Sequence, residues 1–237
     1  MRSAAKFAQH IRELLREHGS PEHAAGVQWF FKKKVQSYGW YTEDLRKEAA
    51  RFRRSILSDA DHEYLVEVAD KLFRGEVMDE KNMGVLLLEK EVGACTPTDF
   101  RRFESWLDRV TSWADHDALA HYVLGPMMAA EPKRVKRVSV WAKSPNVWHR
   151  RAAAVALIQG ARREMFRGEI VLVAGLLLAD EEDMVQKGVG WLLREWAKKS
   201  PRRALPYLMK IRGQAPRLVL RTACEKLSAA ERARVLG

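Results

Sequence analysis

The sequence predicts an all-α protein: an α-solenoid of stacked antiparallel helix pairs, as in HEAT-like repeats, with a concave basic face. Three observations predict this fold. Apolar residues recur at three- and four-residue spacing along most of the 237 residues, and no segment alternates convincingly with the period of a strand. The connections between these segments are short, which favours antiparallel neighbours. Helices with an arginine beside an apolar stripe recur about every 30 to 45 residues, a spacing typical of HEAT-type repeats.

The helix-forming segments share a one-sided apolar pattern and are, in order, residues 7–15, 45–56, 64–73, 84–92, 99–110, 151–158, 189–197 and 218–227. Residues 169–180 are apolar enough for a buried strand, but their length and their place between helices predict a buried helix. A capping hydroxyl followed by proline predicts further helix starts at Ser20-Pro21, Thr96-Pro97, Ser144-Pro145 and Ser200-Pro201. We expect residues 1–237 to form a single domain.

Positive charge is concentrated in the C-terminal part of the chain. The formal net charge is +11, yet residues 1–100 hold 16 Lys and Arg against 17 Asp and Glu, whereas residues 101–237 hold 26 against 14. This one-sided basicity is typical of a protein that binds a polyanion such as nucleic acid. The alternatives are a charge that serves solubility or binding to an anionic membrane, but no basic helix with an uninterrupted apolar face is evident.

The sequence also predicts a cytoplasmic protein. No apolar run reaches the length of a membrane span, and the first residues are charged, unlike a signal peptide. Cys95 and Cys224 lie far apart without CxxC spacing, so they suggest neither a disulfide nor a zinc site. Buried structural thiols are the favoured interpretation.

The stretch TSWADHDALAHYV, residues 111–123, places acids beside an aromatic in this basic chain. Trp113 and Asp117 are four residues apart and therefore share a helix face. Asp115 suits the first helical turn, where an acid complements the helix dipole. His121 follows Asp117 by four residues, but no third ligand has matching spacing, so we expect no metal site and no cofactor. His116 and His121 receive no role, and an isolated Asp117 would most simply be a structural hydrogen-bond acceptor.

A second segment, residues 144–155, places His149, Arg150 and Arg151 in the first turns of a helix. The helix dipole disfavours positive charge there, so their presence suggests a phosphate clamp. The alternative is a solvated helix face.

A third segment, residues 183–199, carries Gly188 and Gly190 inside a helical pattern, which indicates close approach of another helix or of a ligand backbone. Trp191 lies between Lys187 and Arg194 on one face, an arrangement typical of a nucleic-acid groove. Because the chain has eight tryptophans, most of them must belong to the core.

These three segments, in this order, resemble the AlkD-type DNA glycosylases, the HEAT-like-repeat enzymes of DNA alkylation repair. The matching stretches are SWADHDALA (112–120), SPNVWHRRAAAV (144–155) and DMVQKGVGWLLREWAK (183–198), with a fainter match over residues 20–46. The resemblance implies that Asp117 is the catalytic carboxylate and that Trp113 and Trp191 are aromatic walls beside the deoxyribose of the lesion.

The same resemblance makes Arg151 a phosphate contact and places Phe30 where the best-known members have a tyrosine, so that the ring is kept and the hydroxyl is lost. It implies a monomeric enzyme that excises cationic N3- or N7-alkylated purines from duplex DNA without flipping the base into a pocket. Two alternatives remain open: a non-catalytic HEAT-like module that binds damaged or branched DNA, and a solenoid that binds protein.

Overall fold

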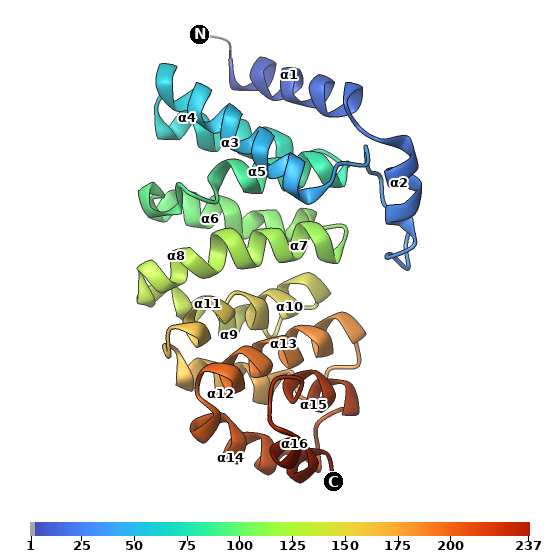
Figure 1. Cartoon of the computed structure of the whole chain (residues 1–237). Helices are drawn as coiled ribbons and strands as arrows, with labels where there is room; N and C mark the ends of the chain where they lie inside the picture. Colours follow the sequence, from blue (N-terminus) through green and yellow to red (C-terminus); the bar gives the residue numbers. More distant parts are fainter. Residues whose placement is uncertain (1–2) are drawn as a thin grey trace. The chain divides into compact units, whose positions relative to one another are not determined.

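The computed structural model describes residues 3–237, and every regular element in that range is helical, which confirms the predicted all-α fold (Figure 1). The helices form two compact units, of which the first ends at Val123 and the second begins at Leu124. Residues 1 and 2, which the expected single domain includes, lie outside the described residues.

The first unit consists of seven α-helices and short helical turns. They are α1 (Ala4–Glu17), α2 (Pro21–Gln28), α3 (Thr42–Asp59), α4 (His62–Phe73), α5 (Met78–Leu88), η1 (Val92–Ala94), α6 (Pro97–Ser105), η2 (Trp106–Arg109) and α7 (Trp113–Leu119), followed by a π-helical turn, η3 (Ala120–Leu124), at the unit boundary.

Helices of the first unit pack both on chain neighbours and on helices two or three places away in the chain. Helix α4 packs against α1 and α5, α3 packs against α5, and α5 packs against α7. The core contains stacked aromatic rings: Phe73 and Trp106 lie parallel with centroids 4.4 Å apart. The indole nitrogen of Trp106 donates a 2.8 Å hydrogen bond to Asp70, which satisfies the one polar atom that burial of this ring would otherwise isolate.

The second unit continues the helical pattern. Its elements are α8 (Gly125–Ala130), η4 (Pro132–Lys136), α9 (Arg137–Trp141), α10 (Val147–Val155), α11 (Ile158–Arg162), α12 (Arg167–Leu176), α13 (Asp183–Lys199), α14 (Pro201–Ile211), α15 (Arg217–Ala223) and α16 (Ala229–Leu236).

Helix α13 is central to the second unit and packs against α10, α11, α14 and α15. The two glycines singled out in the sequence allow this packing. A Cβ at Gly190 would lie 2.7 Å from Cβ of Thr222 on α15, and one at Gly188 would lie 3.2 Å from Cγ of Arg151 on α10. The expectation of close helix approach is therefore confirmed, and the physical reason is side-chain exclusion.

Two predictions about helices need correction. Residues 167–176 form a helix as expected, but Val171, Leu172 and Leu176 on one side of it are exposed, so the helix is only half-buried. The start predicted at Ser144-Pro145 falls two residues later: the side chain of Asn146 caps α10 by accepting a hydrogen bond from the backbone N–H of Trp148. An asparagine oxygen caps as well as a serine hydroxyl, which explains the shift.

The two cysteines differ in environment. Cys224 is buried as expected, and burial raises the pKa of its thiol, which keeps it protonated and inert. Cys95 is only half-buried, and its Sγ lies 3.5 Å from Nε2 of His62. The expectation of a simple buried thiol is therefore wrong for Cys95.

Candidate nucleic-acid site

The start of α7 is anchored by the acid that the sequence assigned to the first helical turn. Asp115 is fully buried, and its carboxylate accepts hydrogen bonds from the backbone N–H groups of Thr111 and Ser112 and from the Ser112 hydroxyl. The equally buried ammonium of Lys81, on α5, lies 3.5 Å from the same carboxylate and donates to the carbonyl of Arg109. These contacts fix where α7 begins and which residues face outward.

Asp117, two residues after Asp115 on α7, is held by its neighbour in sequence. Nδ1 of His116 lies 2.7 Å from Oδ1 of Asp117, and the histidine side chain is fully buried whereas the aspartate side chain is 20% exposed. A carboxylate only accepts hydrogen bonds, so an ionised Asp117 requires the histidine tautomer that carries a proton on Nδ1. His116 received no role from the sequence, because residues adjacent on a helix are expected to point in different directions.

Trp113 begins α7 and is 37% exposed. The ring of Phe31 stacks on it, with centroids 4.9 Å apart and an interplanar angle of 14°. The family resemblance indicates Phe30, the preceding residue, and gives no role to Phe31. The signal was present in the Phe30-Phe31 pair, but sequence alone did not determine which ring faces α7.

The segment that follows α2 displays two aromatic rings to solvent. Trp29 is 85% exposed and Phe30 is 66% exposed, and their rings meet edge to face. The side-chain amide of Gln28 donates to the carbonyls of Phe31 and Lys33 and accepts from the backbone N–H of Val35. This amide holds the segment in a defined conformation, so the two exposed rings belong to an ordered surface.

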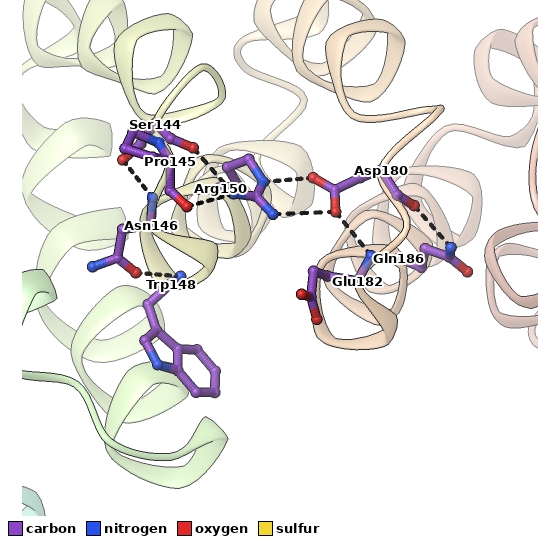
Figure 2. A network of polar contacts seen from close by, with 8 residues as sticks. All are labelled: Ser144, Pro145, Asn146, Trp148, Arg150, Asp180, Glu182 and Gln186. Atoms are coloured by element: carbon purple, nitrogen blue, oxygen red, sulfur yellow. Dashed lines mark hydrogen bonds and ion pairs between the residues drawn. The ribbon is translucent and has the colours of Figure 1, made fainter.

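In the second unit, the guanidinium of Arg150 contacts other residues of the same chain (Figure 2). Its guanidinium forms an ion pair with Asp180 at 2.6 Å and donates to the carbonyls of Ser144 and Pro145, the residues that precede α10. Asp180 also accepts from the backbone N–H of Glu182, immediately before α13. Arg150 therefore connects the starts of two helices, a role that the sequence pattern did not reveal.

Arg151 lies on the side of α10 that faces α13. It is 5% exposed, and its guanidinium Nη1 donates to the carbonyl of Met184 in the first turn of α13. Gly188 provides the space for its side chain. His149, the third member of the predicted clamp, is half-buried in the first turn of α10.

The other predicted contacts of this unit lie on α13. Lys187 is exposed, whereas Trp191 is half-buried one turn later. Arg194 forms ion pairs with Glu195 and with Glu225, so its charge is balanced inside the unit. Lys187 is thus the member of the predicted set that offers an exposed cation.

The charge of the chain divides with the two units. Residues 1–123 carry 19 Lys and Arg against 21 Asp and Glu, while residues 124–237 carry 23 against 10. The candidate carboxylate belongs to the nearly neutral first unit, and the excess of cations belongs to the second. None of the helices formed by residues 3–237 is long and apolar enough to cross a membrane.

A family model described as "DNA alkylation repair enzyme" matches residues 11–227. A solved structure of a predicted DNA alkylation repair enzyme from Enterococcus faecalis is 16% identical, with a TM-score of 0.79, and the match covers 89% of this chain and 97% of that one. AlkD2 from Streptococcus mutans is 19% identical with a TM-score of 0.60, covering 79% and 96% of the two chains.

The smu.31 protein from Streptococcus mutans UA159 is 18% identical with a TM-score of 0.56, covering 78% of this chain and 100% of that one. At these identities the structural likeness shows a shared fold. No curated protein matches the sequence.

Proposed function

The chain belongs to the family of DNA alkylation repair enzymes, and we propose that it is a monofunctional DNA glycosylase that excises cationic N3- or N7-alkylated purines from duplex DNA. The observation that carries this proposal is the arrangement on α7: a partly exposed carboxylate, Asp117, held by a buried histidine on the helix whose first residue is the partly exposed Trp113.

The chemistry of a cationic lesion explains why one carboxylate suffices. A purine alkylated at N3 or N7 is already a good leaving group, so the base needs little protonation. Positive charge instead develops at C1′ of the sugar as the glycosidic bond lengthens. A carboxylate fixed nearby stabilises that charge, as it does in glycoside hydrolysis. Neutral bases leave too slowly, which gives selectivity for cationic lesions.

Hydrolysis exchanges the bond from C1′ to the purine nitrogen for a bond from C1′ to the oxygen of water. The C1′–N bond breaks and its electron pair leaves with the purine, which becomes neutral. The oxygen of a water oriented by Asp117 forms a bond to C1′, and one proton of that water passes to the carboxylate and then to solvent. The faces of Trp113 and Trp191 add cation–π stabilisation of about 0.5 to 2 kcal/mol each where they face the developing charge.

For the DNA contacts, we propose that the exposed rings of Trp29 and Phe30 lie against the DNA and that Lys187, His149 and Arg151 approach its phosphates. The ordered segment after α2, the exposure of Lys187 and the cationic excess of the second unit support this. For Arg150 and Arg194 the intramolecular ion pairs favour a supporting role, in which they position α10 and α13. The lesion would remain in the duplex rather than enter a pocket, and the enzyme would act as a monomer without a cofactor.

The test is release of free base from methylated duplex DNA in the presence of a metal chelator, with 7-methylguanine and 3-methyladenine measured by chromatography. We expect Asp117→Asn to lower the rate by about 100-fold or more, with unchanged affinity for undamaged duplex. Asp59→Asn, an exposed acid of the same unit, is the matched control. If the native protein binds the methylated duplex but releases no base, the non-catalytic module is the correct function.

A further inference from the structure

Three side chains of different donor chemistry meet near the starts of two helices of the first unit. His62 is the first residue of α4, Cys95 directly precedes the capping residue of α6, and Asp99 lies in the first turn of α6. One possible ligand atom of each lies within 4.8 Å of the other two. The sequence did not suggest this cluster, because 33 residues separate His62 from Cys95 and the spacing matches no metal motif.

The spacing within the cluster fits a tetrahedral metal ion. Zinc binds sulfur at about 2.3 Å and imidazole nitrogen at about 2.0 to 2.1 Å, so two such ligands at the tetrahedral angle lie about 3.6 Å apart. The observed separation of Cys95 Sγ and His62 Nε2 is 3.5 Å. An oxygen of the Asp99 carboxylate lies within 4.8 Å of both of these atoms, and a side-chain rotation that brings it closer would complete three ligand positions.

Contacts within the first unit orient all three side chains, and Sγ of Cys95 also donates to the carbonyl of Glu91 at 3.7 Å. Oδ2 of Asp99 accepts hydrogen bonds of 2.8 and 2.7 Å from the backbone N–H and the hydroxyl of Thr96. Its other oxygen, Oδ1, accepts none within residues 3–237. The imidazole of His62 directs Nε2 at the sulfur, while its buried Nδ1 has no hydrogen-bond partner among the described residues.

A sulfur–imidazole contact joins Cys95 to His62, and the capping box of α6 places the Asp99 carboxylate on Thr96, the residue after Cys95. Together these contacts bring a thiol, an imidazole and a carboxylate to one place.

The local charge favours a cation. The chain contains 42 Lys and Arg, yet residues 55–70 and 91–100 contain none, and they hold seven Asp and Glu between them. Of the cations that flank these two ranges in sequence, Arg53 pairs with Glu91, whose carboxylate lies 3.7 Å from its Nε.

We propose that His62, Cys95 and Asp99 bind one divalent transition-metal ion of the zinc type, with water as the fourth ligand. A thiolate, an imidazole and a carboxylate together favour zinc over magnesium or calcium, which prefer oxygen ligands alone. The ion would join the start of α4 to the start of α6 and stabilise the first unit. The three ligands belong to elements other than α7, so this site does not depend on the proposed glycosylase chemistry.

The experiment is a titration of the full-length, chelator-treated protein with ZnCl2 by calorimetry, together with CoCl2 as a spectroscopic probe. We expect one site per chain, a rise in Tm on zinc addition and a near-ultraviolet thiolate-to-cobalt absorption band. Cys95→Ser should abolish the band, and His62→Gln should weaken zinc binding at least about tenfold. Cys224→Ser and His18→Gln, which alter a cysteine and a histidine outside the cluster, should leave binding unchanged.

Asp99→Asn tests the third ligand, but it also alters the cap of α6. Thr96→Ala is therefore the matched variant, since it disrupts the cap and keeps all three ligands. Weak zinc binding in Asp99→Asn with normal binding in Thr96→Ala supports the site. The proposal is overturned if the native protein binds no stoichiometric zinc, or if Cys95→Ser and His62→Gln bind it as the native protein does. Base release without added metal tests only the proposed glycosylase activity, whereas zinc binding in the titration tests only the proposed metal site.

Discussion

The imidazole of His116 and the carboxylate of Asp117 lie 2.7 Å apart, the first fully buried and the second partly exposed on α7. A hydrogen bond to a buried imidazole restricts rotation of the carboxylate, whereas a carboxylate that contacts only water would rotate freely. We therefore interpret His116 as a positioning residue for the carboxylate proposed to act on C1′.

His116→Phe should reduce the rate of base release by about 10- to 100-fold, because it removes the hydrogen bond and keeps a ring of similar size. His116→Asn should recover part of the rate, since its amide N–H can occupy a place near Nδ1. Affinity for undamaged duplex should change in neither variant. Equal rates in the native protein and His116→Phe would show that the histidine serves packing alone.

Trp29→Ala and Phe30→Ala should each weaken binding to duplex DNA, because each removes an exposed ring proposed to lie against it. A ring contact releases no counterions, so the slope of log K against log salt concentration should not change. Lys33→Gln, in the same segment, should lower that slope by about 0.9 if the lysine neutralises one phosphate. Leu172→Ala, which removes an exposed apolar side chain of the second unit, is the control and should have no effect. A matching loss in that control would indicate nonspecific adhesion.

Lys187→Gln should weaken DNA binding and lower the salt slope by about 0.9, because the exposed ammonium can neutralise a phosphate without breaking an internal contact. Arg151→Ala should weaken binding, lower the slope and also reduce Tm, since it removes the hydrogen bond to Met184. Thermal melts and binding at several salt concentrations measure both quantities. A lower Tm with an unchanged slope in Arg151→Ala would assign that arginine to packing.

Lys81→Met should lower the free energy of unfolding by about 3 to 5 kcal/mol, because it leaves the carboxylate of Asp115 buried without its ammonium partner. The start of α7 should loosen, so the rate of base release should fall as well. Denaturant unfolding of this variant and of Lys143→Met, an exposed control, provides the comparison. Equal unfolding midpoints would mean that hydrogen bonds from Thr111 and Ser112 alone are enough to hold Asp115.

Glu195 should make the second unit sensitive to acid. Burial acts to raise the pKa of its carboxyl group, but the hydrogen bond and ion pair with Arg162, together with Arg194, outweigh burial, so its pKa lies below the ordinary value of 4.5. A folded-state pKa below that of the unfolded chain contributes stability above the unfolded value and loses it as the pH falls through the folded value. Glu195→Gln should therefore be less stable at pH 7, and its Tm should approach that of the native protein as the pH falls below about 4.5. A constant difference at every pH would contradict this role.

Several features followed from the sequence because they depend on local physics. The three- and four-residue apolar spacing gave the helices, and Asp115 was recognised as a first-turn acid from its position. Gly188 and Gly190 were read as places of close approach because a helix interior tolerates glycine only at a cost. The family resemblance, carried by three long local segments, agrees with the family to which the chain belongs.

Other features depend on which side chains meet across helices, and these were missed or misplaced. Stacking on Trp113 was attributed to neither phenylalanine, and Phe31 rather than Phe30 supplies it. Arg150 was expected to face phosphate, but Asp180, 30 residues later, pairs with it. The buried partner of Asp115 is Lys81, and the cluster around Cys95 combines residues from two helix starts.

The sequence by itself determined the all-α class, the order of the helices and the short list of candidate residues, because periodicity, caps and local signatures are properties of a single segment. Only the tertiary structure decided which of those residues are exposed and which are engaged. Burial and ion pairing are set by residues distant in sequence, so identical arginines at 150 and 151 acquire different partners. The contact of His116 with Asp117 also depends on tertiary structure. The His116 side chain is buried and the Asp117 side chain is partly exposed, and helical periodicity alone does not determine either exposure.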